Sequence, residues 1–318
     1  MRSPTAEGIA TAAKKIAALL PPTPLLPLEV DGQTVWCKAE CLQPIGAFKI
    51  RGAWHRLTDL DAAERERGVV GVSSGNHAQG VAWAARRLGI AATIVMPRDA
   101  PQVKIEATRA LGADVVLYDR YRESREAIAA DLCKASGATL VHAFADPWVI
   151  EGQGTVGVEI AAQMAERAGG PPTRIVACCG GGGLSAGLAL ACVDAEIVPV
   201  EPEGWDDVCR SLEAGNIVRV QDNPPATACD ALQTLATEPI NFAVLSARGL
   251  RGVRVSEAEV AAAQRLAFAK LHLVVEPGGA AALAAILAGK VPIDGRTALT
   301  ISGGNADPAA FAKVLDAG

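Results

Sequence analysis

The chain of 318 residues has few aromatic side chains, no long apolar run and no excess of positive charge. Aromatic residues make up 4% of a sequence that is 50% hydrophobic, so its core must be aliphatic and rich in alanine, which suits layers of helices on sheets. No apolar run reaches the roughly 18 residues that a membrane span needs. The formal net charge is −5 and no basic patch is seen, so we expect neither nucleic acid nor a membrane as a partner.

The sequence also lacks any Cys-x-x-C pair and the apolar segment of a signal peptide. Its eight cysteines are scattered, and its four histidines do not cluster with them. This spacing indicates neither a disulfide framework nor a zinc site. We therefore expect reduced, buried thiols in a cytoplasmic protein.

Apolar β-branched runs alternate with amphipathic or alanine-rich segments along most of the chain, which predicts an α/β protein with parallel sheets flanked by helices. We predict two lobes. A small α/β domain spans residues 69–146, and a large domain is formed by residues 1–68 and 147–318 together. In the small domain, the pattern includes a helix over Tyr121–Ser136. Ligands of such folds bind beyond the carboxyl ends of the strands.

The most unusual segment is a run of four glycines, Gly180–Gly183, between a predicted strand ending at Cys178 and a helix that begins at Leu184. Glycines allow the backbone to approach a ligand closely, and a helix N-terminus offers unpaired N–H groups, so the segment predicts a phosphate cradle. The alternative is a flexible turn. The run is not followed by Lys-Ser/Thr, and no Gly-x-Gly-x-x-Gly with a suitably placed acidic residue occurs, so the common nucleotide-binding loops are excluded.

A second candidate segment, Gln43–Ala53, places Lys49 near the start of a helix and beside Phe48. A helical lysine is ordinarily a solvated surface residue. A lysine near a phosphate cradle, however, suggests an amine that forms a Schiff base, because desolvation or a cationic neighbour lowers its pKa.

Two further polar segments follow predicted strands. Ser73–Gly80 offers hydroxyls, an amide and helix N-terminal N–H groups that can hold a carboxylate, although ordinary helix capping explains the same residues. Ser302–Asn305 follows the last strand, where Ser302 can hydrogen-bond an aromatic nitrogen.

Together these four segments resemble the fold type II pyridoxal phosphate (PLP) enzymes, in particular the threonine/serine dehydratase and serine racemase family. The matching motifs are Phe48–Ala53, Ser74–Gln79, Gly180–Gly183 and Ser302–Asn305. Their order and spacing agree with the family's over nearly the whole chain, and the resemblance implies a two-domain fold like that of the tryptophan synthase β-subunit.

The resemblance also implies a role for each motif residue. Lys49 would carry the cofactor as a Schiff base and later move protons, and Ser74 would be a second acid or base on the opposite face. The cofactor would be held by Phe48 against the ring, Asn76 at the ring hydroxyl, Gly180, Gly181, Gly182, Gly183 and Leu184 at the phosphate, and Ser302 at the ring nitrogen. The substrate would be bound by Ser74, Gly75, Asn76, His77 and Arg125.

An acidic segment that begins at Glu201 resembles the family's cation site. Glu201, Asp207 and the carbonyl of Trp205 would be the ligands, and oxygen ligands suit Mg²⁺ or Ca²⁺. The alternative is a solvated acidic loop.

The activity that the resemblance implies is β-elimination, in which L-threonine or L-serine yields a 2-oxo acid and ammonia, in a cytoplasmic homodimer. Two departures and one match leave the substrate open. His142–Asp146 lacks the family's proline and first acidic residue, and Glu151 stands where a small residue is common. Arg125 matches an arginine of the racemase-like members and suits a dicarboxylate if it points inward; the alternative is a helix-surface arginine. The alternatives are a serine racemase, a 3-hydroxyaspartate ammonia-lyase and a PLP-binding protein without catalytic activity.

Overall fold

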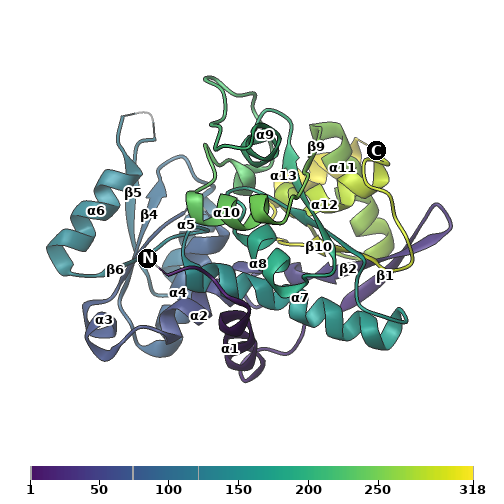
Figure 1. Ribbon diagram of the computed structural model, residues 1–318. Helices are drawn as coiled ribbons and strands as arrows, with labels where there is room; N and C mark the ends of the chain where they lie inside the picture. Colours follow the sequence, from purple (N-terminus) through teal and green to yellow (C-terminus); the bar gives the residue numbers. More distant parts are fainter. Residues whose placement is uncertain (1, 74, 121, 318) are drawn as a thin grey trace.

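A computed structural model describes residues 2–73, 75–120 and 122–317, and these residues form two sheets with helices packed on them (Figure 1). The six-stranded sheet has the order β1-β2-β10-β7-β8-β9, and the four-stranded sheet has the order β5-β4-β3-β6. The strands are β1 (Leu25–Val30), β2 (Gln33–Ala39), β3 (Val69–Val72), β4 (Ala92–Pro97), β5 (Asp114–Tyr118), β6 (Thr139–Val141), β7 (Arg174–Cys178), β8 (Glu196–Pro202), β9 (Val253–Val255) and β10 (Thr297–Ile301).

Thirteen α-helices lie between and beside these strands in the described part of the chain. They are α1 (Ala6–Ala17), α2 (Lys49–Thr58), α3 (Ala62–Arg67), α4 (Asn76–Leu88), α5 (Gln102–Ala110), α6 (Arg125–Ser136), α7 (Pro147–Arg167), α8 (Gly183–Ala191), α9 (Asp207–Ala214), α10 (Pro239–Ala247), α11 (Glu257–Leu266), α12 (Pro277–Leu287) and α13 (Pro308–Asp316). Short 3-10 segments are η1 (Glu40–Leu42) and η2 (Asp230–Leu232), and the π-helical segment η3 (Ala267–Leu271) extends α11.

All strand pairs are parallel except the hairpin of β1 and β2. Asp31 and Gly32 connect that hairpin, with φ values of 49° and 76°. Two successive positive φ values match the two-residue turns that fit the twist of an antiparallel hairpin, and an Asp-Gly pair tolerates them well. The predicted parallel sheets are therefore confirmed, with one antiparallel edge that the sequence analysis did not predict.

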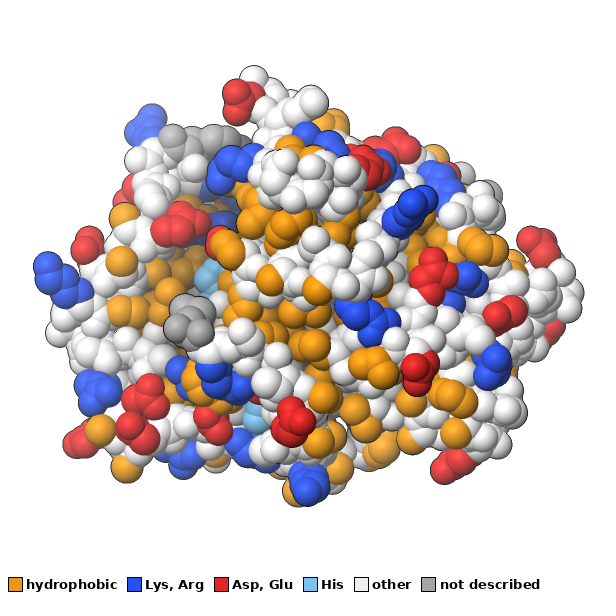
Figure 2. Space-filling model, in the orientation of Figure 1, with side chains coloured by type: hydrophobic (Ala, Val, Ile, Leu, Met, Phe, Trp, Pro, Cys, Tyr) orange, Lys and Arg blue, Asp and Glu red, His pale blue; other side chains and the backbone are white. Residues whose placement is uncertain are grey.

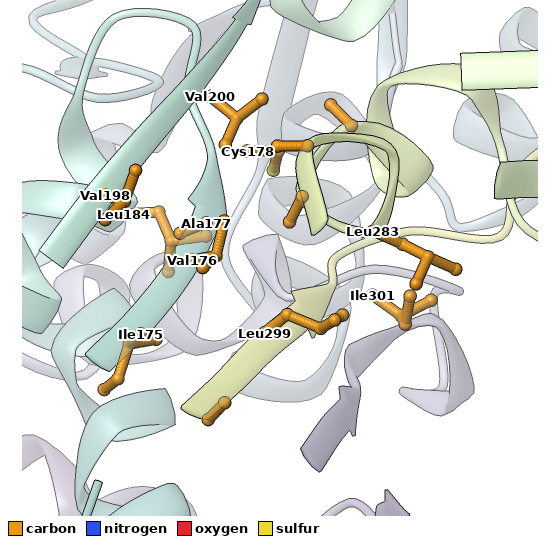
Figure 3. Close-up of a cluster of buried hydrophobic side chains, with 14 of the residues drawn as sticks. Ile175, Val176, Ala177, Cys178, Leu184, Val198, Val200, Leu283, Leu299 and Ile301 are labelled. Atoms are coloured by element: carbon orange, nitrogen blue, oxygen red, sulfur yellow. The ribbon is translucent and has the colours of Figure 1, made fainter. Parts of the chain in front are cut away.

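The large sheet is the centre of an aliphatic core (Figure 3). Ile175, Val198 and Leu299 from adjacent strands are buried in it, and α12 packs over β7, β8 and β10. The low aromatic content is consistent with this core, because aliphatic side chains pack closely between a sheet and its helices. A rigid central sheet fixes the strand ends from which the candidate site is built.

The small sheet carries α4, α5 and α6, and α4 also packs against α2 of the other lobe. Its strands fall between Val69 and Val141, within the predicted small domain. The exact domain boundaries stay a prediction. Within the described residues, no helix combines the length and apolar character needed to cross a bilayer.

One predicted helix was wrong in its start. Instead of beginning at Tyr121, which lies outside the described residues, α6 begins at Arg125. The Ser124 hydroxyl accepts a hydrogen bond from the backbone N–H of Ala127 and so caps the helix at that point.

Candidate active site

A cavity of about 560 Å³ lies where the four predicted motifs converge. It is lined from the large-sheet side by Lys49, the glycine run and Ser302, and from the small-sheet side by Asn76 and His77. Figure 2 shows a hollow in the surface in which a histidine lies recessed among hydrophobic side chains. The carboxyl ends of β3, β7 and β10 all lead into this cavity, as expected for an α/β fold.

Lys49 is the first residue of α2, and its Nζ donates a hydrogen bond of 2.8 Å to the carbonyl of Ala143. The Phe48 ring centroid lies 5.2 Å from this Nζ. Burial disfavours the charged form of the amine and lowers the pKa of Lys49 to about 8. At pH 7 about one tenth of the amine is then the free base, far more than for a solvated lysine, and the free base is the state that a Schiff-base nucleophile requires.

The glycine run forms a backbone cradle at the start of α8. Gly182 has φ 88°, and a Cβ on Gly181 would collide with the Phe144 ring. No described residue accepts a hydrogen bond from the backbone N–H groups of Gly180–Gly183. The carbonyl of Gly181 is held from behind by the Thr237 hydroxyl and the Asn241 amide, at 3.0 and 2.8 Å. The loop is thus fixed with its donors available for an anion.

Ser302 follows β10 and is buried, with its hydroxyl 2.9 Å from the thiol sulfur of Cys178. Its carbonyl accepts a hydrogen bond from the backbone N–H of Phe48, and Ala47 forms a bridge with Gly303. The residue preceding Lys49 and the turn after the last strand are therefore tied together, which fixes both sides of the cavity floor.

Asn76 is oriented by two partners. Its Nδ2 donates to Oε1 of Glu276 at 2.5 Å, and its Oδ1 accepts from Nδ2 of Asn305 at 2.8 Å. An amide NH₂ has two hydrogens, so one remains to donate toward the cavity. Burial raises the pKa of Glu276, although the charge of Lys104 acts in the opposite direction.

The N-terminus of α4 carries the predicted carboxylate site. No described residue accepts a hydrogen bond from the backbone N–H groups of Asn76 or His77. The His77 ring does not serve as a donor to this site, because its Nε2 is 2.9 Å from the carbonyl of Val141 and burial lowers its pKa to about 3. The ring is therefore neutral, and the helix N–H groups remain for a carboxylate. Ser74, the predicted second acid or base, lies outside the described residues.

These groups fit PLP. The cradle offers N–H donors to a phosphate, Asn76 retains a donor for a ring hydroxyl oxygen, and Ser302 presents a hydroxyl for a ring nitrogen. Lys49 lies in the same cavity with a lowered pKa. The predicted cofactor residues are thus brought together.

The predicted substrate residue Arg125 lines the cavity, but its side chain is 43% exposed and pairs with Glu126 at 2.8 Å. Arg219, an exposed residue that the sequence analysis did not single out, lines the same cavity from the other lobe. Lys104 and Asp230 also meet here, with Nζ and Oδ2 2.5 Å apart. This ion pair joins α5 to η2 and hence the two lobes.

The segment 142–146, which departs from the family's pattern, is fixed by local hydrogen bonds. Nδ1 of His142 accepts from the backbone N–H groups of Phe144 and Ala145, at 3.3 and 2.9 Å. Burial, followed by the charge of Lys49, lowers the pKa of His142 to about 4. Asp146 caps α7 and pairs with Arg56 at 3.1 Å. The loop therefore presents the Ala143 carbonyl to Lys49, and its one acidic side chain, Asp146, pairs with Arg56 and does not line the cavity.

Glu151, the second departure, points away from the cavity. Its carboxylate accepts hydrogen bonds from the Arg2 guanidinium at 2.7 and 2.6 Å and from the backbone N–H of Thr5 at 2.9 Å, and lies 3.4 Å from His55. A side chain on Gly8 would collide with this carboxylate, so Gly8 leaves the space that Glu151 occupies. Glu151 anchors the N-terminal segment and does not line the cavity.

The predicted cation ligands Glu201 and Asp207 are both buried, and neither forms an ion pair with a Lys, Arg or His of the described residues. Glu201 accepts hydrogen bonds from the backbone N–H groups of Val208 and Cys209, at 3.1 and 2.7 Å. Neither carboxylate oxygen of Asp207 has a hydrogen-bonding partner in the described chain. Burial raises the pKa of Asp207 to about 7, and burial and the Asp207 charge raise that of Glu201. Two neighbouring buried carboxylates without an ion-pair partner suit a divalent cation, although no group of three or more His, Cys, Asp or Glu side chains converges among the described residues.

Several residues of the site carried no signal in the sequence. The Ala143 carbonyl, Cys178, Lys104 and Asp230 were not predicted, because their roles arise from contacts between segments far apart in the chain. Glu276 directly precedes the Pro-Gly-Gly start of α12 and follows an apolar stretch. This position is the sequence signal that could have marked it as a site residue.

Comparison with known proteins identifies relatives over almost the full length. The family model described as pyridoxal-phosphate dependent enzyme matches residues 16–303. The chain is 36% identical to the serine racemase of Schizosaccharomyces pombe, over 98% of this chain and 97% of that protein. It is 40% identical to an L-threo-3-hydroxyaspartate ammonia-lyase of Pseudomonas sp, over 89% of this chain and 88% of that protein. The crystal structure of a T.th. threonine deaminase matches with a TM-score of 0.87 at 42% identity, covering 96% of this chain and 99% of that one.

Proposed function

Because the chain belongs to the family of pyridoxal-phosphate-dependent enzymes, we propose that it removes water from a small hydroxy-amino acid. The substrates that we favour are L-threonine and L-serine, which yield a 2-oxo acid and ammonia. The observation that supports this most directly is the buried amine of Lys49, whose pKa is about 8, in the cavity that also holds the glycine cradle and Ser302.

We assign the cofactor contacts to the residues that line the cavity. Gly180–Gly183 with Leu184 would hold the phosphate, Phe48 would pack against the ring, and Asn76 and Ser302 would bond its hydroxyl oxygen and nitrogen. When bound, PLP supplies an electron sink for charge that develops at the substrate α-carbon.

The side chains of the protein would bind the substrate and move protons around it. The N-terminus of α4 would hold the substrate carboxylate through the N–H groups of Asn76 and His77. Lys49, as a free base, would then remove the α-proton. Ser302 can neutralise less charge at a ring nitrogen than an aspartate would, which favours prompt loss of the β-hydroxyl over accumulation of negative charge. Ser74 remains our choice for an acid or base on the opposite face, and that role would permit racemisation of serine.

A second candidate function is elimination from 3-hydroxyaspartate. Arg125 and Arg219 line the cavity from opposite lobes, and a guanidinium pairs well with a second carboxylate. A relative that is 40% identical carries the name L-threo-3-hydroxyaspartate ammonia-lyase, which supports this alternative.

We further propose that Glu201, Asp207 and the carbonyl of Trp205 bind Mg²⁺ or Ca²⁺. The support is the burial of two carboxylates, neither of which forms an ion pair with a cationic side chain of the described chain. We also propose a cytoplasmic homodimer. The eight free thiols suit a reducing compartment, and the dimer rests on the family resemblance.

The test starts from the absorbance spectrum of the purified protein after addition of PLP. A visible cofactor band that is lost in Lys49→Ala and kept in Lys290→Ala, a lysine at an exposed ion pair, is expected. Release of oxo acid from L-serine, L-threonine and 3-hydroxyaspartate would then rank the substrates by kcat/KM. Arg125→Ala should lower the value for 3-hydroxyaspartate selectively if that substrate is preferred. No cofactor band in the unsubstituted protein would reject the proposed function.

A further inference from the structure

Cys178 is the last residue of β7 and lies directly beneath the turn that carries Ser302. Its Sγ is 2.9 Å from the Ser302 Oγ, and both residues are buried and line the cavity. Figure 3 shows Cys178 at the end of its strand, close to Val200 of the neighbouring strand. This thiol is the one described group that has a hydrogen-bonding contact with the Ser302 hydroxyl.

The backbone on both sides of this contact is fixed. Ser302 follows β10, its carbonyl accepts from the N–H of Phe48, and Gly303 bridges to Ala47. Cys178 is paired within the sheet to Val200. Because hydrogen bonds hold both backbones, the freedoms left at this site are rotation of the two side chains about Cα–Cβ and rotation of the hydroxyl hydrogen about Cβ–Oγ.

We propose that Cys178 is a positioning residue that acts through Ser302: its S–H donates to Oγ and thereby directs the Ser302 O–H into the cavity, toward the ring nitrogen of the bound cofactor. This inference rests on the proposed function and concerns the chemical state of that nitrogen. A ring nitrogen that accepts a hydrogen bond stays unprotonated.

The chemistry of the two groups favours this direction. A hydroxyl has one hydrogen to donate and two lone pairs that accept, so an Oγ that accepts from sulfur still has its own hydrogen to donate elsewhere. Burial raises the pKa of the Cys178 thiol to about 11, so the thiol keeps its hydrogen at neutral pH. In the opposite arrangement, Ser302 would donate to sulfur, a weak acceptor, and would turn a lone pair toward the ring. That lone pair would favour a protonated nitrogen and a stronger electron sink.

The assignment makes Cys178 relevant to which reaction the site favours. An unprotonated ring stabilises charge at the α-carbon less than a protonated ring does. Rapid loss of a β-hydroxyl then competes well against slow reprotonation of that carbon. Removal of the thiol hydrogen should weaken the hydrogen bond from Ser302 to the ring nitrogen, so the ring should stabilise charge at the α-carbon still less.

The experiment is ¹⁵N NMR of the holoenzyme reconstituted with PLP labelled at the ring nitrogen. The unsubstituted protein should show the ¹⁵N chemical shift of an unprotonated nitrogen that accepts a hydrogen bond. Ser302→Ala should show the chemical shift of an unprotonated nitrogen that has lost this donor. Cys178→Ala should move the resonance toward the Ser302→Ala value, whereas Cys178→Ser, which keeps a donor, should restore it. The PLP dissociation constant of Cys178→Ala should rise about two- to fivefold, as expected for a weakened neutral hydrogen bond.

Two further variants separate the role of the Cys178 thiol from general effects of removing a buried side chain. Cys192→Ala removes another buried thiol, one that contacts the Gly157 carbonyl, and should leave the ¹⁵N shift unchanged. Cys178→Val fills the space of the thiol with a slightly larger apolar side chain that has no donor, and it replaces Cys178→Ala if that variant does not fold. A protonated ring nitrogen in the unsubstituted protein, or equal shifts in it and in Cys178→Val, would overturn this inference alone. Failure of the unsubstituted protein to bind PLP would overturn the proposed function as well.

Discussion

Two groups of buried charge lie in the large-sheet lobe, and they differ in whether each charge has a partner. In the paired cluster, defined as Lys38, Glu40, Arg51 and Glu159, Arg51 lies 2.7 Å from both carboxylates and Lys38 lies 2.6 Å from Glu159. In the acidic pair, Glu201 and Asp207, no cation of the described residues pairs with either. Burial alone therefore does not indicate function. A buried carboxylate without an ion-pair partner does suggest a ligand, because its desolvation must be offset either by a bound cation or by uptake of a proton.

The largest effect is expected from breaking the paired cluster. Arg51→Met leaves Glu40 buried without its cation, and loss of one partner from a buried pair costs about 3–5 kcal/mol of unfolding free energy. Arg51 lies two residues after Lys49 in α2, so cofactor binding should weaken as well. Urea unfolding would measure the loss, with Arg109→Met on the exposed face of α5 as the control. A loss below about 1 kcal/mol would show that the pairs contribute little.

A smaller effect should follow from supplying the acidic pair with a cation. Mg²⁺ or Ca²⁺ at about one hundred times its dissociation constant should raise the unfolding free energy by about 2.7 kcal/mol. Asp207→Asn should abolish this response, while Glu203→Gln, at an exposed neighbouring position, should retain it. Thermal unfolding with and without EDTA is the measurement. An equal response of both variants would place the cation elsewhere.

The pH dependence of stability extends the comparison to another buried carboxylate, Glu151. Burial opposes the charge of Glu151, but hydrogen bonds from His55, Arg2 and the N–H of Thr5 prevail and lower its pKa to about 2. Because the folded pKa lies below the unfolded value, the stabilisation is present above about pH 4.5 and is lost as pH falls toward 2. Between about pH 5.5 and 3.5 the unsubstituted protein should lose about 1 kcal/mol more than Glu151→Gln. Parallel pH curves for the two proteins would contradict this.

The smallest effect belongs to an exposed pair. Lys15 and Asp59 are 3.5 Å apart, with side chains 28% and 38% exposed. Lys15→Ala should change the unfolding free energy by less than about 0.5 kcal/mol, since solvent screens such pairs. A larger change in the same urea titration would mean that exposure is a poor guide to the value of an ion pair here.

The sequence predicted those parts of the site that are encoded locally. Gly180–Gly183 and Ser302 each follow a strand, and parallel strands bring their carboxyl ends to one edge of a sheet, so their convergence was predictable. The predicted position of Lys49 near a helix start was also confirmed, since Lys49 is the first residue of α2. In contrast, β1 was not predicted, because Pro27 interrupts its pattern and the strand pairs at the edge of the sheet.

Contacts between distant segments were not predictable from one sequence. Lys104 and Asp230 are 126 residues apart, and Asn76 and Glu276 are 200 apart. The role of Glu151 depends on Arg2 and on the space left by Gly8, and no periodic pattern connects these residues. Pairing of side chains across a fold depends on tertiary geometry, on which hydrophobic periodicity carries no information.

The ion pair of Lys104 with Asp230 has a consequence for the rate of turnover. It joins α5 of the small-sheet lobe to η2 of the other lobe at the wall of the cavity, and Asp230 is 35% exposed on its side chain. If the lobes separate to release product, this contact breaks, and dissolved salt weakens the attraction on the Asp230 side, which reaches solvent, while Lys104 is buried. If opening limits turnover, kcat should increase with ionic strength, and Asp230→Asn should reproduce that increase in dilute buffer.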